Sequence, residues 1–150
     1  MKLALITASI LSLIISFSAH ADLPGKHPGY LHALTDLRTA RWLLNHQPGD
    51  AKVYGDEDVA VNEIDAAISE IKKASIDDGK DLHDHPQVDV SEHGSRLLKS
   101  IETLKKAHGD IDQEEDNPAA KELRHHALEH IDHAIHAAEK AHAEWLKDKK

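Results

Sequence analysis

Four stretches of this sequence place leucine, isoleucine and alanine three or four residues apart, and this spacing constrains the fold more than any other feature. Apolar residues at that spacing line one side of a helix, whereas a strand alternates apolar and polar residues. No stretch alternates convincingly. The sequence therefore predicts an all-α chain whose helices cover about residues 28–45, 56–76, 95–108 and 117–147.

Residues that start or end helices separate these stretches. Gln47-Pro48-Gly49-Asp50 ends the first helix and Asp77-Asp78-Gly79 ends the second. Gly109 is expected to follow the third helix directly, because the residue after a helix C-terminus is commonly glycine. Asn117-Pro118 predicts the start of the fourth helix, since asparagine caps helices and proline is favoured at the first helical position.

The chain also repeats itself, without a gap, at an offset of 67 residues. Ile64-Asp65-Ala66-Ala67-Ile68 falls on Ile131-Asp132-His133-Ala134-Ile135, and the leucines of the first helix fall on apolar residues of the third. This repeat indicates two tandem helical hairpins. Two hairpins that each bury one face are expected to pack as an antiparallel, up-and-down four-helix bundle, with an acidic linker at about residues 77–93.

The N-terminus has the features of a secretory signal peptide. Lys2 precedes a short apolar run, and Ala19-His20-Ala21 has the small residues of a cleavage site. The run is short for a membrane span, which needs about 20 apolar residues. We expect residues 1–21 to be removed, residues 22–150 to form one domain without stable membrane insertion, and the protein to be periplasmic or secreted.

Charge and cysteine content exclude several classes of function. The net charge is −9 at pH 7, which does not suit nucleic acid, because phosphates attract clustered lysine and arginine. A chain without cysteine has no disulfides, thiolate metal sites or covalent haem attachment. His108 and His142 are expected to face the core, but at opposite ends of their hairpin. They therefore cannot ligate one haem together, and no haem is expected.

Histidine is the unusual residue, with 14 in the chain. On the fourth helix, His126, His130 and His133 form one ladder, on the side opposite Leu128 and Ile131. Residues three or four positions apart can share an ion, so this face is expected to bind Zn²⁺, Cu²⁺ or Ni²⁺. The predicted chelating pairs are His126 with His130 and His133 with His136.

The linker offers a second candidate metal site at His83-Asp84-His85, because a flexible loop can wrap an ion. For both candidates the alternative is a solvated polar surface that happens to contain histidine. Exposed pairs from a single helix lack the third and fourth ligands of a structural site.

Two catalytic patterns occur on the fourth helix, and neither has the setting it needs. Residues 126–130 match the zinc-peptidase pattern H-x-x-E-H, which requires a third ligand and a cleft. Glu122-x-x-His125 and Glu139-x-x-His142 match the di-iron pattern, which requires two different helices. We therefore expect a protein that is not an enzyme.

Charged residues beside the apolar side of the first helix are a separate signal. Arg38 and Arg41 lie close to Leu34 and Leu37 in the helical register. They are expected to form ion pairs between helices at the rim of the bundle. The alternative is a recessed arginine pair that binds a carboxylate or phosphate ligand.

Several motifs resemble a family of small exported bacterial helical proteins that has no established activity. The opening is similar in HPGYLHALTDLRTAR at residues 27–41, and the likeness continues in IDDGKD at 76–81, EEDN at 114–117 and HID at 130–132. The resemblance covers most of the chain after residue 21. It implies an exported helical protein and directs attention to His27, Tyr30, His32, Asp36, Arg38 and Asp77-Asp78.

Together these features predict an exported, non-enzymatic, histidine-rich bundle that binds or buffers divalent transition metal ions. The expected ligands are His126, His130, His133, His136, His83 and His85. The alternative is a structural or stress-related protein that binds a periplasmic protein partner, with its histidines as a pH-responsive surface.

Overall fold

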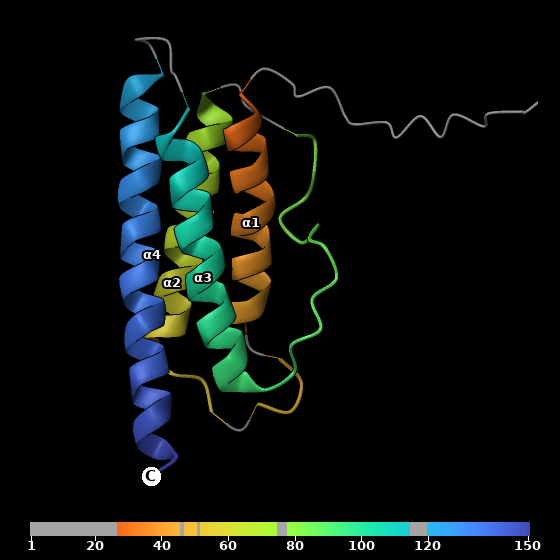
Figure 1. Ribbon diagram of the computed structural model, residues 1–150, viewed down its shortest axis with the longest axis vertical. Coiled ribbons are helices and arrows are strands. Elements are labelled where there is room, and N and C mark those ends of the chain that lie inside the picture. Colours follow the sequence, from red (N-terminus) through yellow and green to blue (C-terminus); the bar gives the residue numbers. More distant parts are fainter. Residues whose placement is uncertain (1–26, 46, 51, 75–77, 115–119) are drawn as a thin grey trace, which may run out of the picture.

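The computed structural model describes residues 27–45, 47–50, 52–74, 78–114 and 120–150, which contain four helices (Figure 1). α1 covers Pro28–Leu44, α2 Gly55–Lys73, α3 His93–Asp112 and α4 Lys121–Asp148. The described residues contain no strand, so the predicted all-α four-helix bundle is confirmed. No described helix is both long and apolar enough to cross a bilayer. The predicted signal peptide and the Asn117-Pro118 helix start lie outside the described residues.

The helices follow the order α1, α2, α4, α3 around the bundle, and neighbouring helices are antiparallel (Figure 1). On the seam between α2 and α4, Asp56 near the start of α2 pairs with Lys140 near the end of α4. On the seam between α1 and α3, Asp36 pairs with Lys106. Each predicted hairpin is present, and each packs lengthwise against the other.

The connection between the hairpins differs from the predicted up-and-down order. α2 and α3 run in the same direction, so residues 78–92 return along the outside of α1 (Figure 1). Asp78 binds Arg38, and the ring of His85 packs on Trp42 one turn further along α1. This crossover is possible because extended chain spans about 3.3 Å per residue and a helix rises only about 1.5 Å per residue.

Small and branched apolar side chains make the core. Ile64 on α2 and Ile131 on α4 have no exposed surface. Because the distance between packed helices depends on the side chains at the contact, alanine allows close approach. Fully buried alanines line α2 and α4 in particular, at Ala60, Ala67, Ala127, Ala134, Ala138 and Ala141.

Two details of α3 differ from the prediction. The apolar spacing of the third predicted helix includes Leu98, but this side chain is 49% exposed, because the buried stripe follows Leu97, Ile101 and Leu104. Gly109 does not end the helix, which continues to Asp112. Ile111 is fully buried and extends the stripe by one more turn, so packing outweighs the helix-ending preference of glycine.

The order and directions of the helices are those expected if an approximate two-fold axis exchanged the two hairpins. Gly29 at the start of α1 donates its backbone N–H to Glu114, just after the end of α3. The residue that corresponds to Gly29 at the 67-residue offset is Arg96, near the start of α3. Arg96 binds Asp50 in the loop between α1 and α2. The first helix of each hairpin therefore begins next to the loop that joins the two helices of the other hairpin. The relation predicts that residues 67 apart meet where the axis crosses a seam.

The arginines of α1 occupy two different environments. Arg41 binds Asp65 on α2 with an Nε–Oδ1 distance of 2.6 Å and is partly exposed, as expected for a rim ion pair. Arg38 is fully buried, and its guanidinium donates to both carboxylate oxygens of Asp78 at 2.8 and 2.5 Å. The rim prediction is therefore wrong for Arg38, which lies in the core and holds the crossover.

Candidate metal centre

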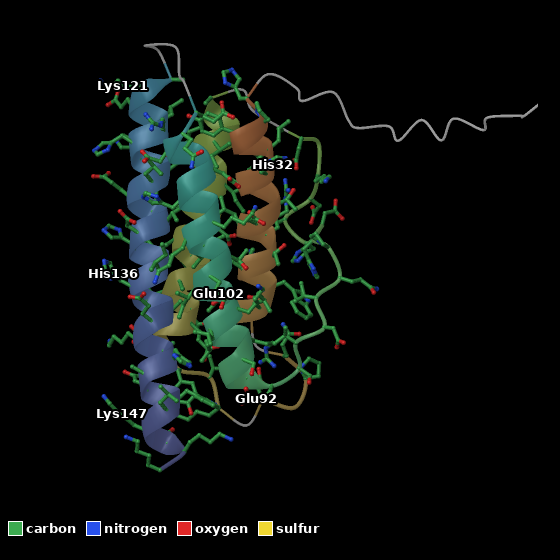
Figure 2. The ribbon with its side chains drawn as sticks, in the orientation of Figure 1. His32, Glu92, Glu102, Lys121, His136 and Lys147 are labelled. Atoms are coloured by element: carbon green, nitrogen blue, oxygen red, sulfur yellow. The ribbon has the colours of Figure 1, made fainter. Side chains whose placement is uncertain are left out.

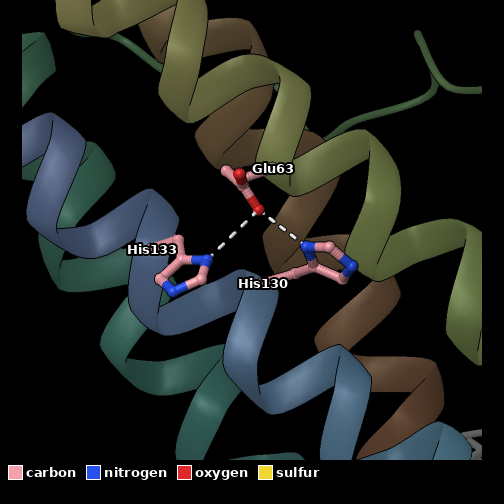
Figure 3. Close-up of side chains that lie close together, drawn as sticks. All are labelled: Glu63, His130 and His133. Carbon is pink, nitrogen blue, oxygen red and sulfur yellow. Dashed lines mark hydrogen bonds and ion pairs between the residues drawn. The ribbon is translucent and has the colours of Figure 1, made fainter.

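Three potential metal ligands from both hairpins meet at the seam between α2 and α4 (Figure 3). The Oε2 atom of Glu63 lies 2.6 Å from Nδ1 of His130 and 3.7 Å from Nδ1 of His133. All three ligand atoms lie within 4.8 Å of one another. The side chains are 27%, 34% and 66% exposed for Glu63, His130 and His133, so the group lies at the edge of the core and is open to solvent on one side.

The local sequence explains this position. Glu63 directly precedes the buried Ile64 of α2, and His130 directly precedes the buried Ile131 of α4. Successive helical residues are about 100° apart, so each of these polar side chains lies at the flank of its helix's buried face. The close packing of α2 on α4 then brings the two flanks together.

The sequence predicted that the histidine ladder of α4 faces water on the side opposite the core. His133 is mostly exposed, but His130 lies at the flank of the buried face, against Glu63. The prediction took Leu128 as part of the inward stripe, but Leu128 is only partly buried. The fully buried Ala127, Ala134 and Ala141 move the centre of the buried face around the helix, toward His130. Because alanine in a sequence predicts burial only weakly, the sequence analysis placed the buried face of α4 on the wrong side of these alanines.

The predicted chelating pairs do not form as expected. The pair that the structure brings together is His130 with His133. His126 lies further along the same seam, near Glu70, whose pKa is lowered first by a hydrogen bond from Lys73 and further by the charges of His126 and His130. His136 is 80% exposed on the outside of α4 (Figure 2), where its Nδ1 lies 3.9 Å from Glu139.

The two linker histidines are also separate. His83 is exposed, and its backbone N–H donates to Asp81. The His85 ring packs on Trp42 with centroids 4.9 Å apart, and its Nδ1 lies 2.7 Å from the carbonyl oxygen of Pro86. Within the described part of the chain, Glu63, His130 and His133 form the one set of three potential ligands that lie close enough to share an ion.

Glu63 is the candidate ligand that sequence reasoning missed, although the sequence contains a signal for it. The internal repeat aligns Glu63 with His130, at the 67-residue offset. In two hairpins related by a two-fold axis, aligned residues face each other where the axis crosses a seam. The repeat could therefore have identified this contact if the order of the helices had been known.

His108 and His142 lie at the edge of the core, with ordinary partners. Nε2 of His108 is 3.5 Å from Oδ1 of Asp132, and the His142 ring stacks on Trp145 with centroids 5.9 Å apart. Each histidine has a packing role at its own end of the hairpin.

Most residues that the family resemblance emphasised make contacts within the bundle. Tyr30 is buried, Asp36 binds Lys106, and Nδ1 of His27 lies 3.8 Å from Glu114. His32 is exposed on α1 (Figure 2), and Asp77 lies outside the described residues. His27 and Asp36 hold α1 against the end and the middle of α3, and Arg38 holds the crossover through Asp78. These contacts lie at different points along α1.

A second polar group, at the other end of the bundle, joins the α1–α2 loop to α3. Nε2 of His93 lies 2.9 Å from the buried Glu57, and its Nδ1 lies 3.6 Å from Asp50. Asp50 also accepts from the buried Arg96. Burial acts to raise the pKa of Asp50, but the hydrogen bonds from Arg96 and from the backbone of Gln47 outweigh it and lower the pKa. These three ion pairs join the first hairpin to α3 of the second.

Comparisons of this chain with protein-family models, curated proteins and solved structures find no match. The chemistry of the site therefore follows from its own residues. Two imidazole nitrogens and one carboxylate oxygen suit Zn²⁺, Cu²⁺ and Ni²⁺, which accept nitrogen and oxygen donors.

Proposed function

We propose that this chain is an exported, non-enzymatic protein that binds a divalent transition metal ion, Zn²⁺, Cu²⁺ or Ni²⁺, and buffers or carries it. The observation that supports the proposal is the convergence of Glu63, His130 and His133 from two hairpins (Figure 3). Three ligands held by packed helices exceed what an exposed pair on one helix provides, because less side-chain and backbone freedom is lost on binding.

An ion at this position would also cross-link the hairpins. Glu63 belongs to the first hairpin, and His130 and His133 belong to the second. Because the site is assembled only in the folded bundle, the free energy of metal binding adds to the free energy of unfolding. Metal handling and fold stability are thus coupled in this proposal.

The test is calorimetric titration of residues 22–150, which contain every described residue, with each metal at pH 7.4. We expect sub-micromolar binding of one ion, weakened at least about tenfold, or about 1.4 kcal/mol, in Glu63→Gln and in His130→Ala. His136→Ala is the matched control, since His136 lies on the outside of the same helix. Binding weaker than about 100 μM, unchanged in Glu63→Gln and His130→Ala, would exclude the proposed site.

The second candidate function, an interaction protein with a pH-responsive surface, is favoured by the exposed histidines of α4 that face carboxylates. Nε2 of His125 lies 3.3 Å from Glu129, and His136 lies near Glu139. This function predicts indifference to metal and self-association or partner binding that changes between pH 5 and pH 7. Sedimentation at the two pH values, with and without Zn²⁺, separates the two candidates.

A further inference from the structure

Four ionisable side chains lie buried where the start of α3 meets the first hairpin. Asp50 belongs to the loop between α1 and α2, Glu57 to α2, and His93 and Arg96 to α3. The side chains of Asp50, Glu57 and Arg96 are 8%, 2% and 4% exposed, and that of His93 is 13% exposed. Because an unbalanced charge is costly away from water, the charges of such a group are expected to cancel.

Arg96 balances only one of the two carboxylates. It binds Asp50, which also accepts a hydrogen bond from the backbone N–H of Gln47 at 2.9 Å. Glu57 accepts a hydrogen bond from the backbone N–H of Tyr54 at 2.9 Å, and this donor carries no charge. With a neutral His93, the group would therefore keep one net negative charge.

The imidazole of His93 lies between the two carboxylates. Its Nε2 is 2.9 Å from Oε1 of Glu57, and its Nδ1 is 3.6 Å from Oδ1 of Asp50. A neutral imidazole has a proton on one ring nitrogen and a lone pair on the other, so one carboxylate would face a lone pair. We infer that folded His93 carries a proton on both ring nitrogens and that this imidazolium makes the junction between the hairpins sensitive to pH.

Four further titratable side chains surround the ring, and each has a partner of its own. The Tyr54 ring meets the His93 ring edge to face, with centroids 5.6 Å apart, and its hydroxyl is 3.1 Å from Asp148. The other three line a hollow of about 330 Å³ beside His93, and they are Lys52, Glu92 and Lys149. Lys52 pairs with Asp148, Glu92 accepts from the backbone N–H of Ser95, and Lys149 lies over the ring of Trp145. The hollow is the route by which the His93 proton can reach solvent.

Removal of the proton from Nδ1 restores the net negative charge and leaves a lone pair facing Asp50. The unfolded chain releases the same proton near about pH 6.5. Stability follows the difference in bound protons between the two states, so this contribution is full below about pH 6.5 and is lost as the pH rises. The contact joins the end of the crossover to the first hairpin, and alkaline pH is therefore expected to weaken that end of the bundle.

Nuclear magnetic resonance of ¹⁵N-labelled, metal-free residues 22–150 at pH 7.5 tests the protonation state directly. The two nitrogens of an imidazolium have similar chemical shifts, whereas those of a neutral ring are well separated. His93 is expected to show two protonated nitrogens. The exposed His32 on α1 is the reference for an imidazole in water (Figure 2), and the His93 signals are assigned by their absence in His93→Gln.

Two variants test the effect on stability by urea denaturation. His93→Gln keeps a hydrogen-bond donor but cannot carry a charge. The ratio of its unfolding constant to that of the unaltered protein is expected to fall about tenfold between pH 5.5 and pH 8.5. His32→Gln is the matched control, and its ratio is expected to stay constant. Glu57→Gln removes one of the two carboxylates, so it should reduce the pH dependence, and it tests the inference even if His93→Gln does not fold.

The outcomes are distinct. Two protonated ring nitrogens, together with stability curves for the unaltered protein and His93→Gln that converge at high pH, support the inference. An unprotonated nitrogen in His93 at pH 7.5 overturns it, and so do stability curves that stay parallel across the pH range. An unchanged pH dependence in Glu57→Gln also counts against it. Since the protein is free of metal throughout, none of these results depends on the proposed metal site.

Discussion

Arg38 has no exposed surface, and its guanidinium donates two hydrogen bonds to the carboxylate of Asp78, 40 residues later in the chain. This pair joins the middle of α1 to the first part of the crossover. The buried Nε of Arg38 has no hydrogen-bond partner among the described residues. The charge of Arg38 is thus compensated mainly by one carboxylate, which makes that carboxylate important for stability.

Asp78→Ala is expected to lower the free energy of unfolding by about 3 kcal/mol, because it leaves the buried Arg38 charge without its partner. Asp65→Ala is the matched control, since its arginine partner Arg41 is partly exposed, and it is expected to cost less than about 1 kcal/mol. Urea denaturation at pH 7 measures both. Equal losses in the two variants would contradict the difference in burial.

Acid should weaken the same contact. Burial is the largest single effect and acts to raise the pKa of Asp78. The hydrogen bonds from Arg38 and from the backbone of Lys80, together with the charges of both residues, outweigh it, so the folded-state pKa lies below the ordinary value of 3.8. A carboxyl group with a lowered pKa contributes its full stability above the unfolded value and loses it as the pH falls through the folded value. We expect a steep fall in unfolding free energy below about pH 4, with a smaller fall in Asp78→Asn. If the unfolding free energies of the unaltered protein and of Asp78→Asn fall in parallel as the pH is lowered, Asp78 does not contribute to the acid sensitivity.

Metal should raise thermal stability in proportion to binding. At a free Zn²⁺ concentration of about 100 times Kd, the expected gain is about 2.7 kcal/mol, visible in calorimetry as a higher Tm. Glu63→Gln should abolish most of the gain, and His136→Ala should keep it. The gain should also shrink at pH 5, where protons compete for imidazole. A Tm that rises equally in Glu63→Gln would place the ion elsewhere.

The alanine seam can be tested by enlarging one residue. Ala134→Leu adds three carbon atoms where α4 packs on α2, and overpacking of this kind costs about 1–3 kcal/mol. The same change should weaken metal binding, because it pushes His133 away from Glu63. Leu98→Ala, on the exposed side of α3, should change neither property and serves as the control.

The spacing of apolar residues was sufficient to predict that the chain forms four α-helices, because the 3.6-residue period is a local property of the chain. It located α1 and α2 closely, and it missed the end of α3, where the buried Ile111 continues the helix past Gly109. The candidate metal ligands were only partly predictable. His130 and His133 followed from spacing on one helix, whereas Glu63 required knowing which helix packs beside α4.

The sequence by itself determined four amphipathic helices and two similar hairpins, since these depend on residues near one another in the chain. Only the tertiary structure decided that the crossover returns along α1 and that α2 lies beside α4. It also decided that buried alanines turn the histidine ladder toward Glu63. These features depend on contacts between distant residues, whose free energy comes from close packing and paired charges that no local pattern records.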